Sequence, residues 1–295
     1  MVRWPPNIPE LGTADPSWFG IALSTLDGHV YEVGDVHREF TIQSVSKPFV
    51  YALALADRGL DEVLRWVGVE PSGEAFNSIR LDGDTGWPLN PVVNAGAIVT
   101  ASLADGGTAG ERFARILAGL SEFAGRELEV DEGVYTSESR TGDRNRALAY
   151  LMHGTGALRC GVEDALRVYF GQCSVLVTAH DLAVMAATIA AGGVHPVTGR
   201  VVVSPAVAQH VLTSAPRSSS ARTSCSVSGT WSARQPCLLP SRTFSATSRL
   251  PRRNGWRTRI RPVSPRCRRQ SRTIWRSGCG RPRSDNPAYL YSHLV

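Results

Sequence analysis

Lysine is almost absent from this chain of 295 residues. Lys47 is the only lysine among the 32 basic residues, and all the others are arginines. Arginine stays protonated in proteins, whereas a lysine removed from water can lose its proton and serve as a base. Lys47 is therefore the one cationic side chain of the sequence that is suited to accept a proton from a neighbouring hydroxyl group.

Long apolar runs are also lacking. No stretch of about 18 apolar residues predicts a membrane span, and the N-terminus lacks the apolar region of a secretory signal. We therefore expect a cytoplasmic protein with reduced thiols and no membrane association. The six cysteines include no C-x-x-C pair and no histidine stands at zinc-ligand spacing, so we expect neither a metal nor a cofactor.

Acidic residues nearly disappear in the C-terminal part. Residues 214–295 hold 17 arginines and one acid, Asp285, for a net charge of +16, whereas residues 1–213 hold 15 basic and 25 acidic residues, for −10. The basic part has neither strand nor helix periodicity, and high charge with few aliphatic residues is typical of disorder. A nucleic-acid-binding tail, a disordered appendix and out-of-frame translation of GC-rich DNA all fit. We favour the last and do not expect nucleic-acid binding.

Ser44 precedes Lys47 by three residues, so one helical turn would place hydroxyl and amine on the same face. Residues 40–42 predict a short strand, and residues 48–56 predict a helix too apolar for the surface. Ser44 would then lie at a helix start, where backbone N–H groups favour developing negative charge. Penicillin-binding proteins and serine β-lactamases have this arrangement. On spacing alone, a solvated lysine on a helix explains the pattern better.

The remaining pattern predicts an α+β fold. Residues 19–25 and 29–33 read as strands joined at Asp27-Gly28, a strong hairpin signal. Residues 70–98 are rich in proline, glycine and asparagine and predict loops. Helices are predicted at residues 61–67, 109–124, 143–152, 162–171, 180–191 and 205–212. A two-stranded sheet is seldom stable alone, and residues 214–295 show no pattern that would supply further strands.

Residues 8–213 closely resemble the serine-dependent glutaminases of bacteria, relatives of the β-lactamase and penicillin-binding fold. The blocks that carry the resemblance are, in chain order, Ile-Gln-Ser-Val-Ser-Lys (42–47), Glu-Pro-Ser-Gly (70–73) with Phe-Asn-Ser-Ile (76–79), Asn-Pro-Val-Val-Asn-Ala-Gly-Ala-Ile (90–98), Ser-Glu (137–138) with Arg-Asn-Arg-Ala (144–147), and Gly-Gly-Val-His-Pro-Val-Thr-Gly (192–199). The resemblance implies a β-lactamase-like fold, an antiparallel sheet with a helical layer, and a homodimer or homotetramer. It also implies an amidohydrolase that converts L-glutamine to L-glutamate and ammonia.

The resemblance further implies that Ser44 is the acylated nucleophile and Lys47 its proton acceptor, with Asn94, Glu138, Asn145 and Tyr169 contacting glutamine. An anionic group suits the ammonium of an amino acid, and amides suit its carboxylate and carboxamide. Each residue also has a structural interpretation. Asn94 fits a cap or a loop, Glu138 and Asn145, seven residues apart, fit a solvated face, and Tyr169 fits an apolar core. Cys173 is predicted to be a core residue and His195 a loop residue.

The sequence departs from the family downstream of residue 213. The family continues with a Lys-Ser-Gly strand and a glycine run whose backbone N–H completes an oxyanion hole, but this chain has no second lysine. Losing one such donor costs about 10²- to 10³-fold in rate. We therefore predict an incomplete catalytic domain at residues 1–213, with C-terminal strands missing or replaced and activity impaired. The rival hypotheses are a penicillin-recognising Ser–Lys hydrolase and a non-catalytic protein with a basic nucleic-acid-binding tail.

Overall fold

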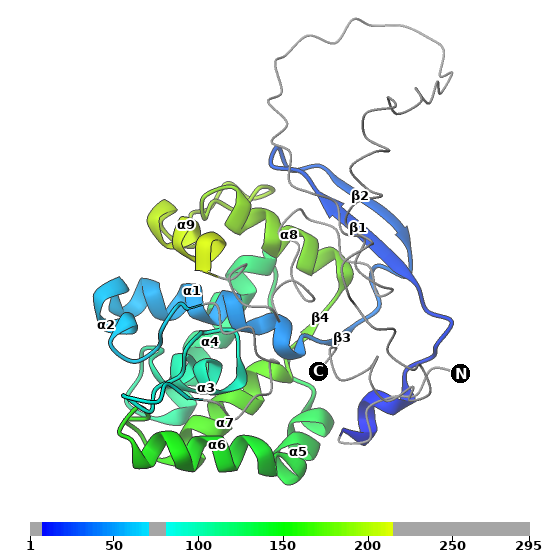
Figure 1. Ribbon diagram of the computed structural model, residues 1–295. Coiled ribbons are helices and arrows are strands. Elements are labelled where there is room, and N and C mark those ends of the chain that lie inside the picture. Colours follow the sequence, from blue (N-terminus) through cyan, green and yellow to red (C-terminus); the bar gives the residue numbers. More distant parts are fainter. Residues whose placement is uncertain (1–7, 71–80, 215–295) are drawn as a thin grey trace, which may run out of the picture. The chain divides into compact units, whose positions relative to one another are not determined.

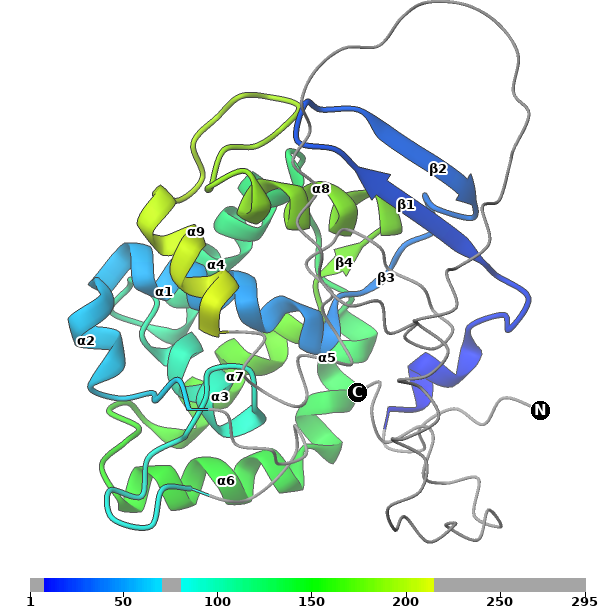
Figure 2. The same ribbon diagram turned by 45° about the horizontal axis from the view of Figure 1, so that its top comes forward.

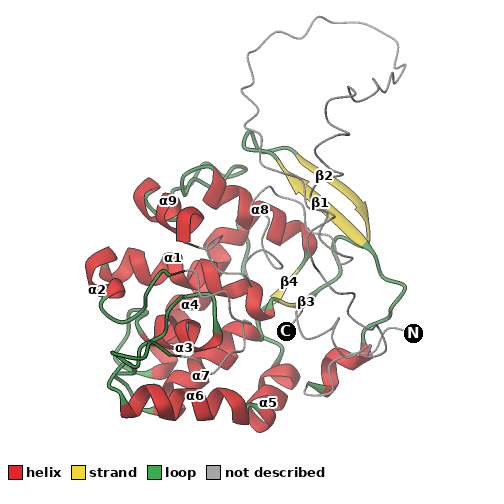
Figure 3. Cartoon of the chain, viewed as in Figure 1, coloured by secondary structure: helices red, strands yellow, loops and turns green. Residues whose placement is uncertain are grey.

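One β-hairpin, one shorter strand ladder and a group of helices make up residues 8–70 and 81–214, which are the residues that the computed structural model describes (Figures 1 and 3). The strands are β1 (Gly20–Ser24), β2 (Val30–Gly34), β3 (Phe40–Thr41) and β4 (Leu176–Val177). The 3-10 turns are η1 (Pro9–Thr13) and η2 (Gln43–Val45). The helices are α1 (Ser46–Arg58), α2 (Leu60–Leu64), α3 (Asn94–Ser102), α4 (Ala109–Ala124), α5 (Glu132–Thr141), α6 (Asp143–Gly154), α7 (Val162–Cys173), α8 (Ala179–Ala190) and α9 (Pro205–Ser214).

The predicted hairpin is present as β1 and β2, which pair antiparallel from Gly20↔Gly34 to Ser24↔Val30. Gly28 in its turn has a φ of 88°, a conformation that glycine adopts without steric cost. The inner face of the hairpin packs on α8, and Ala22, Val36 and Ala183 form a small cluster there. The predicted short strand at residues 40–42 is also present, because β3 pairs antiparallel with β4.

Helix α1 lies at the centre of the helical part and contacts α3, α4 and α9 (Figure 2). Its residues from Phe49 to Leu55 are all buried. This confirms the prediction of a helix too apolar for the surface. The largest hydrophobic cluster surrounds α1 with apolar side chains of α4, α8 and α9. A second cluster joins α3, α6 and α7. Both clusters together fix the start of α1 against the helices that carry the expected site residues.

The helices predicted after residue 108 are confirmed by α4, α6, α7, α8 and α9, and α2 confirms a shorter version of the helix predicted at 61–67. The prediction of loops at residues 70–98 is wrong from residue 94 onward, because α3 begins at Asn94. Residues 81–93 contain no helix or strand, and residues 71–80 lie outside the described residues. Its glycine and asparagine lower helix propensity, but every residue from Asn94 to Ala101 is buried, and tertiary packing overrides propensity. Helix α5 was not predicted, since its residues are mostly polar. The side chain of Asp131 caps it by accepting the N–H of Val134.

Gly96 allows α3 to approach the chain that precedes it, because a Cβ at this position would lie 1.9 Å from the backbone oxygen of Asn90. We expect Gly96→Ala to lower the free energy of unfolding by about 2 kcal/mol or more, since the obstructing atom belongs to the backbone. Urea denaturation measures this. The control is Gly110→Ala in the exposed first turn of α4, where a Cβ meets no atom closer than 3.9 Å and a small stabilisation is expected. Equal stability of both variants would contradict the close approach.

Helices and antiparallel strands in this arrangement confirm the α+β fold class. In the described part of the chain, the strands form two-stranded sheets only. The predicted loss of further strands concerns residues after 214, and the blocks at residues 71–73 and 76–79 also lie outside the described residues. Among the helices described, none is long and apolar enough to cross a membrane.

Candidate active site

Ser44 lies in the 3-10 turn η2, which is separated from β3 by Ile42 and leads directly into α1. The preceding residue, Gln43, has a φ of 50° and is the only non-glycine residue with a positive φ in the described ranges. This conformation is unfavourable for an L-residue and persists where surrounding contacts impose it. The Ser46 hydroxyl donates to the Gln43 carbonyl oxygen at 2.7 Å, and the Ile42 N–H donates to the Val175 carbonyl oxygen at 2.8 Å. The turn that presents Ser44 is thus fixed on both sides.

Lys47 lies in the first turn of α1, three residues after the half-buried Ser44, and its side chain is only 2% exposed. The Nζ atom donates a hydrogen bond of 2.6 Å to Oδ1 of Asn94. Burial lowers the pKa of Lys47 to about 8 from the usual 10.5, and the neighbouring Cys173 and Glu138 oppose this shift only in part. At pH 7 only about a tenth of this amine is therefore neutral, but this is far more than for an ordinary lysine. Because the side chain is buried, the solvated-lysine interpretation is wrong.

Asn94 and Asn145 link two helices beside Lys47. Asn94 is the first residue of α3 and is 9% exposed, and its Nδ2 donates to Oδ1 of the half-buried Asn145 on α6 at 3.0 Å. The side chains of Lys47, Asn94 and Asn145 thus form one chain of hydrogen bonds. Lys47 and Asn94 are 47 positions apart in the sequence, and Asn94 and Asn145 are 51 positions apart. Their contact depends entirely on how α1, α3 and α6 pack together.

Glu138 is buried on α5, where desolvation raises the pKa of its carboxyl group to about 7. A hydrogen bond from the side chain of Gln43 and the charge of Lys47 both act in the opposite direction. Tyr169 on α7 is 3% exposed, and burial raises its pKa well above the usual value, with further contributions from Cys173 and Glu138. These mutual electrostatic interactions show that Glu138, Tyr169 and Cys173 lie close to one another, with Lys47 near Glu138 and Cys173. Glu138 is buried and therefore does not lie on a solvated face.

All the side chains predicted from the sequence as site residues lie on elements that meet at the start of α1. His195 lies in the turn after α8, as predicted, and its Nδ1 accepts the backbone N–H groups of Val197 and Thr198. The sequence did not predict that Ser46, Gln172 and Cys173 contribute to this cluster. The fully buried Gln172 donates through Nε2 to the Ser46 hydroxyl at 3.2 Å. Cys173 interacts electrostatically with Glu138 and Lys47. The proximity of Ser46 to the Ser44–Lys47 motif was the only local signal.

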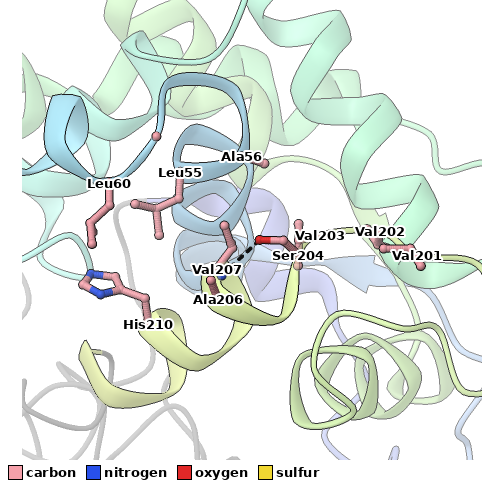
Figure 4. A pocket seen from close by; sticks show the side chains of 11 residues that line it. Leu55, Ala56, Leu60, Val201, Val202, Val203, Ser204, Ala206, Val207 and His210 are labelled. Carbon is pink, nitrogen blue, oxygen red and sulfur yellow. Dashed lines mark hydrogen bonds between the residues drawn. The ribbon is translucent and has the colours of Figure 1, made fainter.

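A separate groove of about 520 Å³ lies between the C-terminal half of α1, α2, α9 and residues 201–204 (Figure 4). Its lining is mainly aliphatic, including Leu55, Leu60 and Val207, with His210 as its titratable group. The Nε2 of His210 lies 2.8 Å from the hydroxyl of Tyr51 on α1. None of the predicted site residues lines this groove, so it is distinct from the cluster around Lys47.

A half-buried serine one turn before a buried lysine, on an α+β scaffold, defines a protein of the β-lactamase-like class. The glutaminase family model matches residues 3–215. The chain belongs to the glutaminase family.

Known relatives match about two thirds of the chain. Glutaminase 1 of Bradyrhizobium diazoefficiens is 59% identical over 197 residues, which are 67% of this chain and 32% of the relative. The glutaminase of Microcystis aeruginosa is 54% identical over 192 residues, 65% of this chain and 57% of the relative. This chain thus matches between about a third and less than two thirds of the length of these relatives.

Solved structures of other proteins share the fold of this chain. The native form of Mglu has a TM-score of 0.70 and 44% identity, over 73% of this chain and 52% of that chain. A probable glutaminase, ybaS, has a TM-score of 0.70 and 38% identity, over 72% of this chain and 69% of that chain.

Proposed function

We propose that this protein is a glutaminase that hydrolyses the side-chain amide of L-glutamine through a Ser44 acyl-enzyme. The observation that carries the proposal is the buried Lys47 amine, whose pKa of about 8 leaves part of it neutral at physiological pH, one turn after Ser44. A serine hydroxyl is a weak nucleophile until an adjacent base takes its proton. The family and the relatives named glutaminase support glutamine as the substrate.

In the proposed reaction, neutral Lys47 takes the proton of the Ser44 hydroxyl as its oxygen attacks the side-chain carbonyl carbon of glutamine. The resulting tetrahedral intermediate expels ammonia, which leaves with the proton returned by the lysine. A water molecule then attacks the γ-acyl ester and gives a proton to the same amine, which returns it to the departing Ser44 oxygen as L-glutamate is released. General base catalysis of this kind typically contributes about 10²- to 10⁴-fold.

The substrate contacts follow from charge and hydrogen-bonding capacity. The carboxylate of Glu138 is proposed to bind the ammonium of glutamine, because the pKa of about 7 leaves this buried group partly ionised. Asn94 and Asn145, already joined to Lys47 by hydrogen bonds, are proposed to bind the substrate's carboxylate and carboxamide. The buried hydroxyl of Tyr169 is proposed to hydrogen-bond beside the Ser44–Lys47 pair. These contacts would select an amino acid with an uncharged amide side chain.

For this chain, we propose reduced turnover, because no second lysine is present to supply a Lys-Ser-Gly strand and the family match ends at residue 215. The boundary at residues 213–214 and the origin of the basic segment remain predictions, as do a cytoplasmic location and a homo-oligomeric state. Metal and cofactor play no part in the proposed step.

Covalent labelling of Ser44 tests the proposal even at low turnover. A glutamine analogue with an electrophilic diazoketone in place of the carboxamide is expected to add to Ser44, and peptide mass spectrometry locates the adduct. Ser44→Ala removes the adduct, whereas Ser102→Ala, on the partly buried end of α3, retains it. Labelling by a fluorescent penicillin, with no labelling by the glutamine analogue, would favour the penicillin-recognising alternative and overturn the proposal.

A further inference from the structure

A second cluster of titratable side chains lies on the β1–β2 hairpin, apart from the residues proposed for catalysis. Glu32 on β2, His37 in the turn that follows and His180 in the first turn of α8 place their potential ligand atoms within 4.8 Å of one another. Sequence spacing gave no sign of it, since His180 is 148 positions from Glu32. Figures 1 and 2 show the hairpin lying alongside α8, which explains how these distant positions meet.

The distances within this cluster fit a transition-metal site. Nε2 of His37 lies 3.3 Å from Oε2 of Glu32, and Nδ1 of His180 lies 2.5 Å from Oε1 of the same carboxylate. Zinc ligands at about 2.0–2.1 Å in tetrahedral geometry stand about 3.4 Å apart. The first separation already matches this value. The second is a hydrogen bond, and it would lengthen by about 1 Å when a metal ion replaces the shared proton.

The backbone holds the three positions in place before any ion binds. Glu32 lies in the β1–β2 ladder opposite Ala22. The backbone N–H of His180 donates to the carbonyl oxygen of Val36 at 3.3 Å, which connects the start of α8 to the residue before His37. The capping box of Thr178 and Asp181 further orders the first turn of α8. Ligands supported in this way bind an ion without a large ordering cost.

The donor set indicates the type of ion. Imidazole nitrogens favour zinc and other late first-row transition metals, whereas magnesium and calcium prefer oxygen ligands alone. Two imidazoles and one carboxylate leave a coordination position open. The side chains are 69% exposed for His37, 29% for Glu32 and 35% for His180, so water can reach that position. A water molecule in the open position would complete the coordination, so the site needs no fourth protein ligand.

We propose that Glu32, His37 and His180 bind a divalent transition-metal ion of the zinc type that fastens the hairpin to α8. The hairpin otherwise packs on α8 through a cluster of small side chains, Ala22, Val36 and Ala183, with Ala179 beside them. Because this cluster has only three buried members, among the described residues, a metal bridge would add to the stability of the hairpin. The expectation of no metal site rested on local cysteine and histidine spacing. It did not consider ligands brought together by folding.

Metal titration of the full chain, produced without a polyhistidine tag and stripped with a chelator, tests the proposal. Calorimetry with Zn²⁺ is expected to show one tight site per chain, weakened at least about tenfold in His37→Gln and in His180→Gln. His29→Gln is the matched control, because His29 also lies on the hairpin beside a carboxylate, Asp27, but outside the cluster. Its zinc affinity should equal that of the unaltered protein.

Cobalt spectroscopy separates this site from metal binding by the cysteines. Co²⁺ bound by two histidines and a carboxylate gives d–d bands without the intense thiolate charge-transfer absorption that cysteine ligands produce. We expect such a spectrum, together with zinc-dependent slowing of hydrogen exchange in β1 and β2. Unchanged affinity in His37→Gln, or a thiolate spectrum, would overturn the proposal. The exposed position of His37 makes its substitution safe for the fold, so loss of binding there cannot be ascribed to unfolding.

Discussion

Lys47→Met is expected to abolish acylation of Ser44 while the protein remains folded. Methionine has nearly the length of lysine but cannot accept a proton, so the labelling rate with the glutamine analogue should fall by about 10³-fold or more. Stability should change little, because the cost of burying a partly charged amine offsets the lost hydrogen bond to Asn94. Labelling kinetics followed by intact mass, together with thermal denaturation, measure both effects.

Two further measurements make this prediction specific. Arg58→Lys exchanges basic groups at the exposed end of the same helix and should leave labelling unchanged. In the unaltered protein, the labelling rate should rise with pH and level off above about 8, because the neutral amine forms as pH passes the pKa of Lys47. A pH-independent rate, or an Lys47→Met variant that labels normally, would remove the lysine from the mechanism.

Glu138→Gln is expected to stabilise the fold while it weakens glutamine binding. Burial raises the pKa of this carboxyl from 4.5 to about 7, so the folded state binds more protons than the unfolded state between these values. The stability of the unaltered protein therefore falls as pH rises through this window. Replacing Glu138 by glutamine removes that loss of stability, and we expect a gain of about 3 kcal/mol at pH 8 and none near pH 4.

The same variant lacks the negative charge proposed for the substrate ammonium. Glutamate or glutamine affinity should fall by about 30-fold or more, since removing one partner of a buried ion pair costs about 2–5 kcal/mol. Calorimetry measures the affinity, and urea titrations at the two pH values measure stability. Glu122→Gln, exposed on α4, is the control and should alter neither quantity. A Glu138→Gln protein that is less stable at pH 8 would contradict the pKa shift. Undiminished affinity would contradict the substrate contact.

Local patterns predicted most of the helical framework and failed where packing overrules propensity. The helix after Pro48 is visible in the sequence as a continuous apolar run, because most of its surface is buried. Helix α4 is visible as a periodic pattern, because only one of its faces is buried. Helix α3 was hidden by Gly96, a residue that weakens an isolated helix but is required where the backbone of Asn90 lies close. The polar helix α5 was hidden because its residues have little preference of their own and fold against α7 and η1.

The candidate site divides in the same way. The motif Ser44-x-x-Lys47 and the order of the glutaminase-like sequence blocks were visible in the sequence. Neither of them shows that Lys47 is buried, and burial is what lowers its pKa. Gln172 and Cys173 gave no signal, since one reaches Ser46 and the other reaches the charged cluster from a helix more than 120 positions away. Their participation depends on where α7 lies relative to the start of α1.

The sequence by itself determined that Lys47, alone among the 32 lysine and arginine residues, could lose its proton, and that an acidic and a basic part meet near residue 213. Only the tertiary structure decided that this amine is shielded from water and bonded to Asn94, and that Glu32, His37 and His180 converge. The physical reason is that residue identity fixes which protonation states and ligands are possible. Solvent exclusion and distance, which decide among them, arise from segments that are remote along the chain.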